Sequence, residues 1–227
     1  GKTAVYLTLA HRVLAEGRRC IVLVPEISLT PQTIRRFLAA FGRRVAVIHS
    51  ALSLSERLDE YKRIRRGEVD VVVGTRSAVF APVEQLGLII VDEEQEHTYR
   101  SEQSPRYDAG EIARLRARRQ GGLCVLASAT PSIETAYRAE KGEYLLAKLT
   151  QRYGGAPLPD VTILDLRERP MAAEALSEEL CEELLQNLNR KEQSILFVNR
   201  RGYSATATCM SCHQPLECPH CSISLKF

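Results

Sequence analysis

The chain has 227 residues, of which 44% are hydrophobic and 26% are charged, and its formal net charge is +3. A chain of this length and composition can bury a core of its own, which excludes an intrinsically disordered protein and a small fold held only by disulfides. No apolar run approaches the length of about 18 residues that a membrane span requires, so we expect no membrane association. A net charge this small does not identify a partner.

The two ends and the cysteines set further expectations. The chain begins with Gly1 instead of Met and stops at Phe227, just after a cluster of cysteines, so we expect a fragment of a larger protein. The other cysteines are scattered at Cys20, Cys124 and Cys181. Scattered cysteines without a secretion signal are typical of a reducing cytosol, and we expect a cytoplasmic protein.

In chain order, helical and strand-like stretches alternate over residues 1–150. Most of the helical stretches have a serine or proline at the start or a glycine at the end, and the strand-like stretches are short runs of valine, isoleucine and leucine. The expected helices are 3–16, 31–41, 53–66, 111–119 and 131–141, and the expected strands are 20–24, 45–48, 69–73, 86–91 and 123–127.

These strand candidates are continuous apolar runs, which is typical of parallel strands buried on both faces. Their alternation with helices predicts an α/β fold with a doubly wound parallel sheet, whose ligands bind at the carboxyl ends of the strands. Residues 151–160 carry Gly154, Gly155 and two prolines and predict a linker. Strand candidates at 161–164 and 194–198, with a helix over 177–190, predict the beginning of a second α/β unit.

Gly1, Lys2 and Thr3 lead directly into the first expected helix. A phosphate-binding loop needs a lysine that reaches the nucleotide phosphates and a hydroxyl that binds Mg²⁺, both at the start of a helix. Only the last three residues of that motif are present, and a match this short also occurs by chance. By itself the pattern is a weak indication of a site for ATP and Mg²⁺.

A second pattern strengthens this interpretation. The apolar run from Leu88 to Val91 delivers Asp92, Glu93 and Glu94 at its carboxyl end. Nucleotide hydrolases hold Mg²⁺ with a strand-end aspartate, and an adjacent glutamate can deprotonate the attacking water. Exposed acids after a strand are ordinary, but together with the first pattern they favour a P-loop nucleotide hydrolase over that alternative.

Small, hydroxyl-bearing or basic residues follow three other expected strands. They are Val24–Glu26, Gly74–Ser77 and Ser128–Pro131. Hydroxyls and backbone N–H groups at these places can bind phosphate oxygens of a nucleotide or a nucleic acid. Each is equally compatible with a helix cap, and Ser128 or Thr130 before Pro131 would be a natural N-cap.

Two Cys-x-x-Cys pairs lie near the end of the chain, Cys209 with Cys212 and Cys218 with Cys221. Thiolates at this spacing form one edge of a Zn²⁺ tetrahedron. The surrounding stretch is polar and contains proline, which disfavours four buried structural cysteines. Residues 204–227 therefore predict a zinc-binding region, although the gap of five residues between the pairs is short for a single shared ion.

The chain closely resembles the PriA family of primosomal replication-restart DNA helicases (primosomal protein N′), in helicase superfamily two. The segments that carry the resemblance span essentially the whole chain: Gly1–Thr3, Leu23–Gln32, His49–Ser50, Gly74–Phe80, Asp92–Glu94, Ser128–Ser132 and Asn199–Tyr203. The most specific of them is Pro-Glu-Ile-Ser-Leu-Thr-Pro-Gln at residues 25–32. The resemblance implies an ATP-dependent bacterial DNA helicase that unwinds duplex DNA with 3′ to 5′ polarity, restarts stalled replication forks and begins primosome assembly.

The resemblance also implies an architecture and partners. Residues 1–150 would be the first RecA-like motor lobe, and residues 161–203 the start of a second lobe into which the zinc-binding region is inserted. The fork-binding domain, the front of the phosphate loop and an arginine finger would be missing, so we expect the isolated fragment to be nearly inactive. The partners would be forked and single-stranded DNA, single-strand-binding protein and other primosome proteins, in association with the bacterial nucleoid.

The resemblance assigns roles residue by residue. ATP and Mg²⁺ would be bound by Gly1, Lys2, Thr3, Asp92 and Glu93, with Thr3 and Asp92 on the metal and Lys2, Asp92 and Glu93 as catalytic residues. Ser128 and Thr130 would couple hydrolysis to DNA movement. Pro25, Thr75 and Arg76 would line the path of single-stranded DNA. The loop 96–107 corresponds to the family's aromatic-rich loop, whose Tyr99 and Tyr107 would stack on bases.

Two features qualify this assignment. The family usually has Asp-Glu-Glu-His where this chain has Gln95 at the fourth position. An amide can donate and accept hydrogen bonds but cannot titrate, so we expect any effect on coupling more than on hydrolysis. In the family the two cysteine pairs belong to two different zinc ions, each completed by another pair further along, which implies two half-sites here.

Two other interpretations remain. One is a different superfamily-two translocase, which would lack the paired cysteines after Asn199–Tyr203. The other is a non-catalytic zinc-binding scaffold that keeps a nucleotide fold, against which the intact Lys2, Thr3, Asp92 and Glu93 argue.

Overall fold

The computed structural model describes residues 1–150, 155, 157–166, 171–173 and 176–197. The chain divides into two compact units, unit 1 (Gly1–Ala156) and unit 2 (Pro157–Phe227). The division falls inside the stretch 151–160 for which the sequence predicts a linker.

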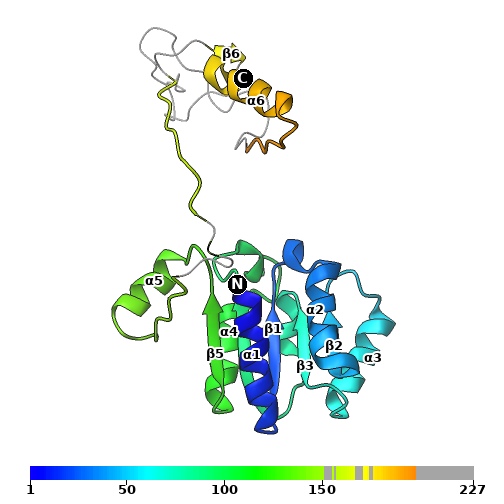
Figure 1. Ribbon diagram of the computed structural model, residues 1–227. Coiled ribbons are helices and arrows are strands. Elements are labelled where there is room, and N and C mark those ends of the chain that lie inside the picture. Colours follow the sequence, from blue (N-terminus) through cyan, green and yellow to red (C-terminus); the bar gives the residue numbers. More distant parts are fainter. Residues whose placement is uncertain (151–154, 156, 167–170, 174–175, 198–227) are drawn as a thin grey trace, which may run out of the picture. The chain divides into compact units, whose positions relative to one another are not determined.

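Unit 1 is built on a five-stranded parallel sheet (Figure 1). Its order is β2-β3-β1-β4-β5, and every pairing is parallel. The strands are β1 (Arg19–Leu23), β2 (Val45–Ile48), β3 (Val71–Gly74), β4 (Leu86–Asp92) and β5 (Leu123–Ala127). The predicted α/β fold with a parallel sheet is confirmed.

Most of the helices of unit 1 begin at a residue whose side chain caps them. They are α1 (Lys2–Ala15), α2 (Pro31–Phe41), α3 (Leu54–Arg65), α4 (Ala109–Arg119) and α5 (Ile133–Glu140), with short 3-10 turns η1 (Glu26–Ser28), η2 (Gly42–Arg44), η3 (Arg76–Phe80) and η4 (His97–Tyr99). Ser53 and Glu56 form a capping box at α3, which satisfies two backbone N–H groups at once. The caps considered for α5, Ser128 and Thr130, were wrong. The cap is Ser132, whose side chain accepts a hydrogen bond from the backbone N–H of Thr135.

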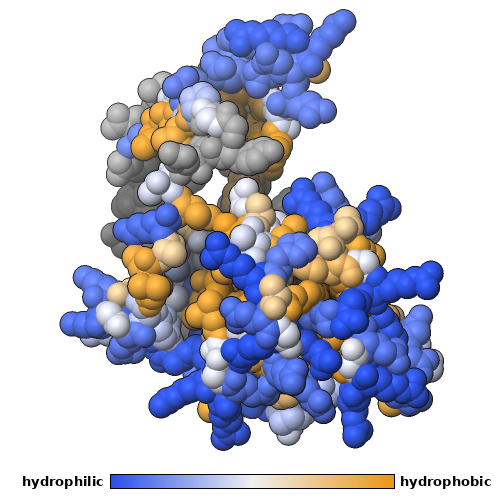
Figure 2. Space-filling view, turned by 60° about the horizontal axis from the view of Figure 1, so that its bottom comes forward, coloured by the Kyte–Doolittle hydropathy of each residue, from blue (hydrophilic) through white to orange (hydrophobic). Residues whose placement is uncertain are grey.

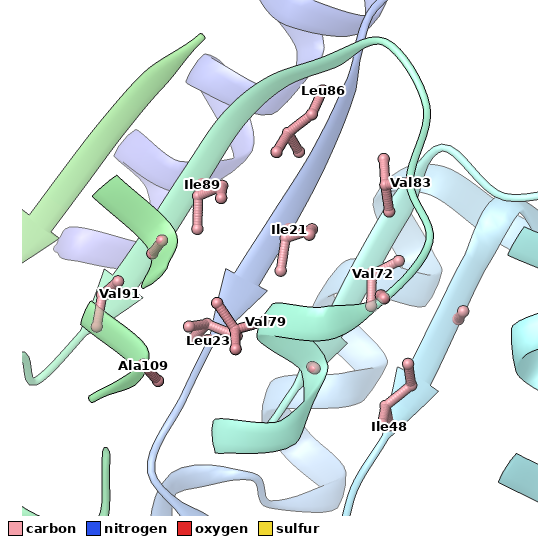
Figure 3. Packing of buried hydrophobic residues seen from close by; sticks show 14 of the residues in the cluster. Ile21, Leu23, Ile48, Val72, Val79, Val83, Leu86, Ile89, Val91 and Ala109 are labelled. Atoms are coloured by element: carbon pink, nitrogen blue, oxygen red, sulfur yellow. The ribbon is translucent and has the colours of Figure 1, made fainter. Parts of the chain in front are cut away.

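The core consists of two apolar layers, one on each face of the sheet. Cys20, Val22, Val73 and Ile90 pack with residues of α1 and α2, such as Tyr6 and Phe37. Their neighbours along the strands, including Ile21, Leu23, Val72 and Ile89, point to the opposite face toward α3, η3 and α4 (Figure 3). Both sets are almost fully buried. Burial on both faces is the physical reason for the continuous apolar runs in the sequence.

The outside of the molecule is mixed. Figure 2 shows hydrophilic side chains protruding across much of the face drawn there, with hydrophobic residues visible between them. The most open part of the sheet is the edge strand β5, where Leu123 is 53% exposed. Among the described residues, no helix is both long enough and apolar enough to cross a membrane.

Unit 2 contains a short antiparallel pair, β6 (Met171–Ala173) with β7 (Leu176–Ser177), followed by α6 (Glu178–Asn189). The helix expected over 177–190 is present as α6, and Ser177 caps it. The strands expected at 161–164 and 194–198 were wrong where the structure describes them, since 161–164 and 194–197 have no regular structure. A strand is stable only when its backbone groups find partners, and in the described part of unit 2 the small sheet pairs only β6 with β7.

The candidate nucleotide and nucleic-acid site

The first helix brings a lysine to the carboxyl edge of the sheet. Lys2 is the first residue of α1, Gly1 occupies the N-cap position, and Thr3 follows on the same turn. The first turn of α1 carries no acidic residue. A helix N-terminus with free N–H groups and no local negative charge attracts anions, phosphates above all.

The acidic residues after β4 meet this lysine. The ammonium of Lys2 forms an ion pair with Glu93 and lies 3.2 Å from Asp92 Oδ1. Burial by itself disfavours the charged form of Lys2, but the hydrogen bond to Glu93 and the charge of Asp92 outweigh it, so the pKa of Lys2 is raised. The hydrogen bond from Lys2 lowers the pKa of Glu93 against the opposing effect of burial. The two sequence patterns, separated along the chain, are therefore joined in space.

Glu93 has an unusual backbone conformation, with a φ of 46°. This left-handed region is disfavoured for residues other than glycine. The turn ends β4 and directs the carboxylate of Glu93 toward Lys2, while the backbone N–H of Glu93 donates to Asp92 Oδ1 at 3.0 Å. The positions of the two acids thus depend on a strained turn at the end of a buried strand.

Two buried tyrosines reach Asp92. The hydroxyl of Tyr6, on α1, donates to Asp92 Oδ1 at 2.6 Å, and the hydroxyl of Tyr99, in η4, donates to the backbone carbonyl oxygen of Asp92 at 2.7 Å. Their side chains are almost fully buried. Tyr6 is not among the site residues predicted from the sequence, although its spacing from Lys2 places both residues on one face of α1.

The expected stacking role of Tyr99 needs correction. Its side chain is only 3% exposed, so in this arrangement the ring cannot stack on a base. Its hydroxyl instead connects the loop 96–107 to the end of β4. Tyr107 is less buried and contacts Phe80 edge to face, with the ring centroids 4.9 Å apart.

Gln95 links Glu93 to the segment after β5. Its amide nitrogen donates to Glu93 Oε2 at 3.2 Å, and its amide oxygen accepts from Ser128 Oγ at 2.6 Å. Ser128 Oγ also accepts from the backbone N–H of Thr130 at 2.8 Å. These contacts form one continuous hydrogen-bonded chain from Thr130 to Glu93. Because an amide has both a donor and an acceptor, Gln95 can serve both neighbours at once.

Glu94, the third acid of the series, has a different partner. Its carboxylate accepts from the backbone N–H of Ser132 at 2.7 Å, from Ser132 Oγ at 3.2 Å and from Thr135 Oγ1 at 3.0 Å. These donors lie at the N-terminus of α5, where a negative charge is favourable. Glu94 therefore fixes α5 to the end of β4, a role that spacing alone does not reveal.

We expect Glu94→Ala to lower the free energy of unfolding by about 1–2 kcal/mol, because it removes a charge-assisted cap and leaves its donors unsatisfied. Urea unfolding measures this change. Glu134→Ala is the matched control, since Glu134 is an exposed acid in the first turn of the same helix. Equal destabilisation by the two variants would contradict the role assigned to Glu94.

The residues expected along the single-strand path also lie together. A hollow of about 160 Å³ is lined by Val24, Pro25, Glu26, Thr75, Arg76 and Thr98. Arg76 Nη1 donates to the carbonyl oxygens of Arg100 at 2.7 Å and Thr98 at 3.3 Å, and its guanidinium lies 5.7 Å from the centre of the Tyr107 ring. Arg76 thus connects this hollow to the loop 96–107, which Tyr99 connects to Asp92.

The predicted zinc ligands Cys209, Cys212, Cys218 and Cys221 lie outside the described residues. Among the residues that are described, no group of three or more histidine, cysteine, aspartate or glutamate side chains is arranged to hold a metal ion.

Known proteins resemble this chain over part or all of its length. The sequence model of DEAD/DEAH box helicases matches residues 1–139. Replication restart protein PriA of Bacillus subtilis is 48% identical and that of Treponema pallidum 42% identical, each over 100% of this chain but over only 28% and 34% of the relative. The chain therefore spans about a third of the length of these relatives.

Among solved structures, the helicase MrfA, described as a DUF1998 helicase, has a similar fold. Its TM-score is 0.51 at 19% sequence identity, and the match covers 88% of this chain and 32% of that one. An identity this low supports the fold alone.

Proposed function

The chain belongs to the DEAD/DEAH box helicase family, whose sequence model matches residues 1–139, and on this premise we propose that it is part of a replication-restart DNA helicase. In this proposal the complete protein hydrolyses ATP to move with 3′ to 5′ polarity along DNA, and it opens stalled forks for primosome assembly. The observation that carries the proposal is the cluster of Lys2, Asp92 and Glu93, where the start of α1 meets the end of β4. The names of the relatives support the replication-restart part.

The residues at the cluster fit ATP and Mg²⁺. Lys2 offers a compact positive charge at a helix N-terminus, which suits phosphate, and Thr3 and Asp92 offer the oxygen ligands that Mg²⁺ prefers. When bound, Mg²⁺ would neutralise negative charge on the β- and γ-phosphates. Gly1 would let the backbone approach the nucleotide closely, because it has no side chain.

Glu93 has the chemistry of a general base. In the arrangement described, its carboxylate is held by Lys2, which lowers its pKa and makes it a weak base. Phosphates that attract Lys2 would take the ammonium away from Glu93, and the basicity of Glu93 would rise at the moment when water must be activated. The same ion pair would keep Glu93 inactive in the absence of nucleotide.

Two sets of contacts support coupling between hydrolysis and DNA. The chain of hydrogen bonds from Thr130 through Ser128 and Gln95 ends at Glu93. Arg76, which lines the hollow with Pro25 and Thr75, holds the loop 96–107 through two carbonyl oxygens. We assign the phosphate backbone of single-stranded DNA to this hollow, because a guanidinium and backbone N–H groups bind phosphate without regard to sequence.

A histidine in place of Gln95 should make coupling depend on pH. A neutral imidazole can donate to Glu93 and accept from Ser128, whereas a protonated one can only donate. We expect the DNA-stimulated turnover of Gln95→His to fall several-fold between about pH 7.5 and pH 5.5, relative to the wild type over the same range. Gln95→Ala is the control and should lose coupling at every pH. Parallel pH profiles for wild type and Gln95→His would refute the assignment.

We also propose that the cysteine pairs bind zinc. Cys209 with Cys212 and Cys218 with Cys221 have the spacing of zinc knuckles. The family resemblance favours two ions in the complete protein, each sharing its coordination with a further pair. Zinc measured per molecule after dialysis distinguishes two ions from one, and Cys209→Ser with Cys218→Ser should remove both.

The partners and location follow from the same proposal. We assign forked and single-stranded DNA, single-strand-binding protein and other primosome proteins as partners, in the cytoplasm and at the nucleoid of a bacterial cell. ATP hydrolysis by the complete protein tests the motor directly, with forked, single-stranded and blunt duplex DNA compared. Strong stimulation by forks supports replication restart. Turnover that ignores DNA, or zinc binding without turnover, would favour a different translocase or a scaffold.

A further inference from the structure

We infer that Tyr6 is a positioning residue for the metal site, because its hydroxyl fixes the orientation of the Asp92 carboxylate. This inference rests on the proposed function, since it assumes that Asp92 faces Mg²⁺ bound with nucleotide. Tyr6 itself touches neither nucleotide nor metal in this proposal and acts only through Asp92.

The helix explains how Tyr6 comes to this place. Lys2 and Tyr6 are four residues apart on α1, so their side chains lie one turn from each other on the same face. That face looks toward the end of β4, where Lys2 contacts Asp92 and Glu93. The ring of Tyr6 belongs to the apolar cluster with Ala10, Cys20 and Ile90 and is only 4% exposed. The cluster holds the ring, and the hydroxyl projects from it to the carboxylate.

The contact is short and directed. Tyr6 Oη donates to Asp92 Oδ1 at 2.6 Å, within the range of hydrogen bonds from a hydroxyl to a charged oxygen. Among the described residues, the contacts to this carboxylate all reach Oδ1: Tyr6, the backbone N–H of Glu93 at 3.0 Å and Lys2 at 3.2 Å. With Oδ1 occupied, Oδ2 is the oxygen that these contacts leave for Mg²⁺ or its water ligands.

Of the three donors to Asp92 Oδ1, Tyr6 is the side chain whose contact should persist when nucleotide binds. Lys2 is drawn to phosphate when nucleotide binds, so its contact with Asp92 is temporary in the proposed function. The N–H of Glu93 belongs to the strained turn itself and reaches Oδ1 at 3.0 Å, a longer contact than the 2.6 Å of Tyr6. A phenol whose ring is packed in an apolar cluster and only 4% exposed stays in place when nucleotide binds. Outer partners of metal ligands set the ligand orientation in this way.

Tyr6→Phe tests the inference in the full-length protein, because phenylalanine keeps the ring and removes only the hydroxyl. The readout is binding of a fluorescent, non-hydrolysable ATP analogue while Mg²⁺ is titrated, with a parallel measurement in EDTA. We expect the Mg²⁺ concentration at half-saturation to rise about tenfold, as is typical when an outer partner of a metal ligand is lost. Binding in EDTA should stay as in the wild type, because nucleotide alone does not depend on the orientation of Asp92.

Tyr61→Phe is the matched control. Tyr61 lies on α3 and packs against the apolar layer on the opposite face of the sheet, so loss of its hydroxyl should not change the Mg²⁺ titration. A double-mutant cycle with Asp92→Ala adds a second check, since Tyr6→Phe should have no further effect on Mg²⁺ dependence once the carboxylate is gone.

The outcomes separate the inference from the proposed function. A wild-type protein that binds the analogue with Mg²⁺, together with a Tyr6→Phe variant that shows the same Mg²⁺ titration, overturns the inference alone. Weaker binding of Tyr6→Phe in EDTA and in Mg²⁺ to the same extent would indicate a general loosening of the site and also overturns it. A wild-type protein that binds no analogue under either condition overturns both.

Discussion

Replacement of Glu93 by glutamine is expected to lower DNA-stimulated ATP hydrolysis by about 10²–10⁴-fold, the usual contribution of a general base. Nucleotide binding should be kept or become tighter. In the nucleotide-free arrangement Lys2 is held by Glu93, and phosphates have to compete with that carboxylate for the ammonium. A neutral amide competes less well. The variant should therefore hold ATP firmly and hydrolyse it slowly, and rapid-quench kinetics combined with nucleotide binding measure the two effects in one preparation.

The control for this prediction is Glu140→Gln, which makes the same chemical change at the exposed end of α5. It should leave both quantities unchanged. If Glu93→Gln lost turnover only in proportion to nucleotide binding, then Glu93 would act on binding and the role of general base would be wrong.

Replacement of Lys2 by alanine is the second large change. It should weaken nucleotide binding and should lower turnover by about 10²–10³-fold, the loss that follows removal of one preorganised charge or donor at a reacting group. It also leaves Asp92 and Glu93 side by side without the cation that both contact. Two neighbouring carboxylates repel each other and would repel the phosphates as well, so binding should suffer in addition to turnover.

Lys2→Arg separates these effects. Arginine keeps the positive charge near the acids but is planar and larger than an ammonium, so the fold should be retained while turnover is lost. Thermal unfolding and nucleotide binding should be measured for Lys2→Ala and Lys2→Arg. The control is Lys62→Ala, because Lys62 forms an exposed ion pair on α3. If Lys2→Ala bound nucleotide with the affinity of the wild type, Lys2 would not contact the phosphates and this prediction would be wrong.

Much of unit 1 could be predicted from sequence, because its sheet is buried on both faces. The apolar runs of β1, β2 and β5 differ from the expected ranges by at most one residue at either end, and β2 and β5 agree at both ends. Motif chemistry and the family resemblance assigned Lys2, Asp92 and Glu93 to one nucleotide site, and the structure brings these three side chains together.

The rest depends on contacts that a linear pattern does not specify. Tyr6 and Glu94 have ordinary surroundings in sequence, and their partners appear only when α1 packs against β4 and the start of α5 lies beside Glu94. Tyr99 looks like a residue of an exposed loop, yet it is buried because η4 folds back over the end of β4. The apolar runs at 161–164 and 194–197 resemble strands, but a strand also requires a neighbour to pair with.

The turn at Glu93 has a consequence for protein engineering. Its φ of 46° costs about 1–2 kcal/mol for any residue with a side chain, a cost that glycine would not incur. Substitution by glycine would remove that strain, but it would also remove the contacts of the carboxylate with Lys2 and Gln95, and these opposing changes together set the melting temperature. A left-handed backbone and the proposed general base belong to the same residue, so any change made there for stability has to be checked against turnover.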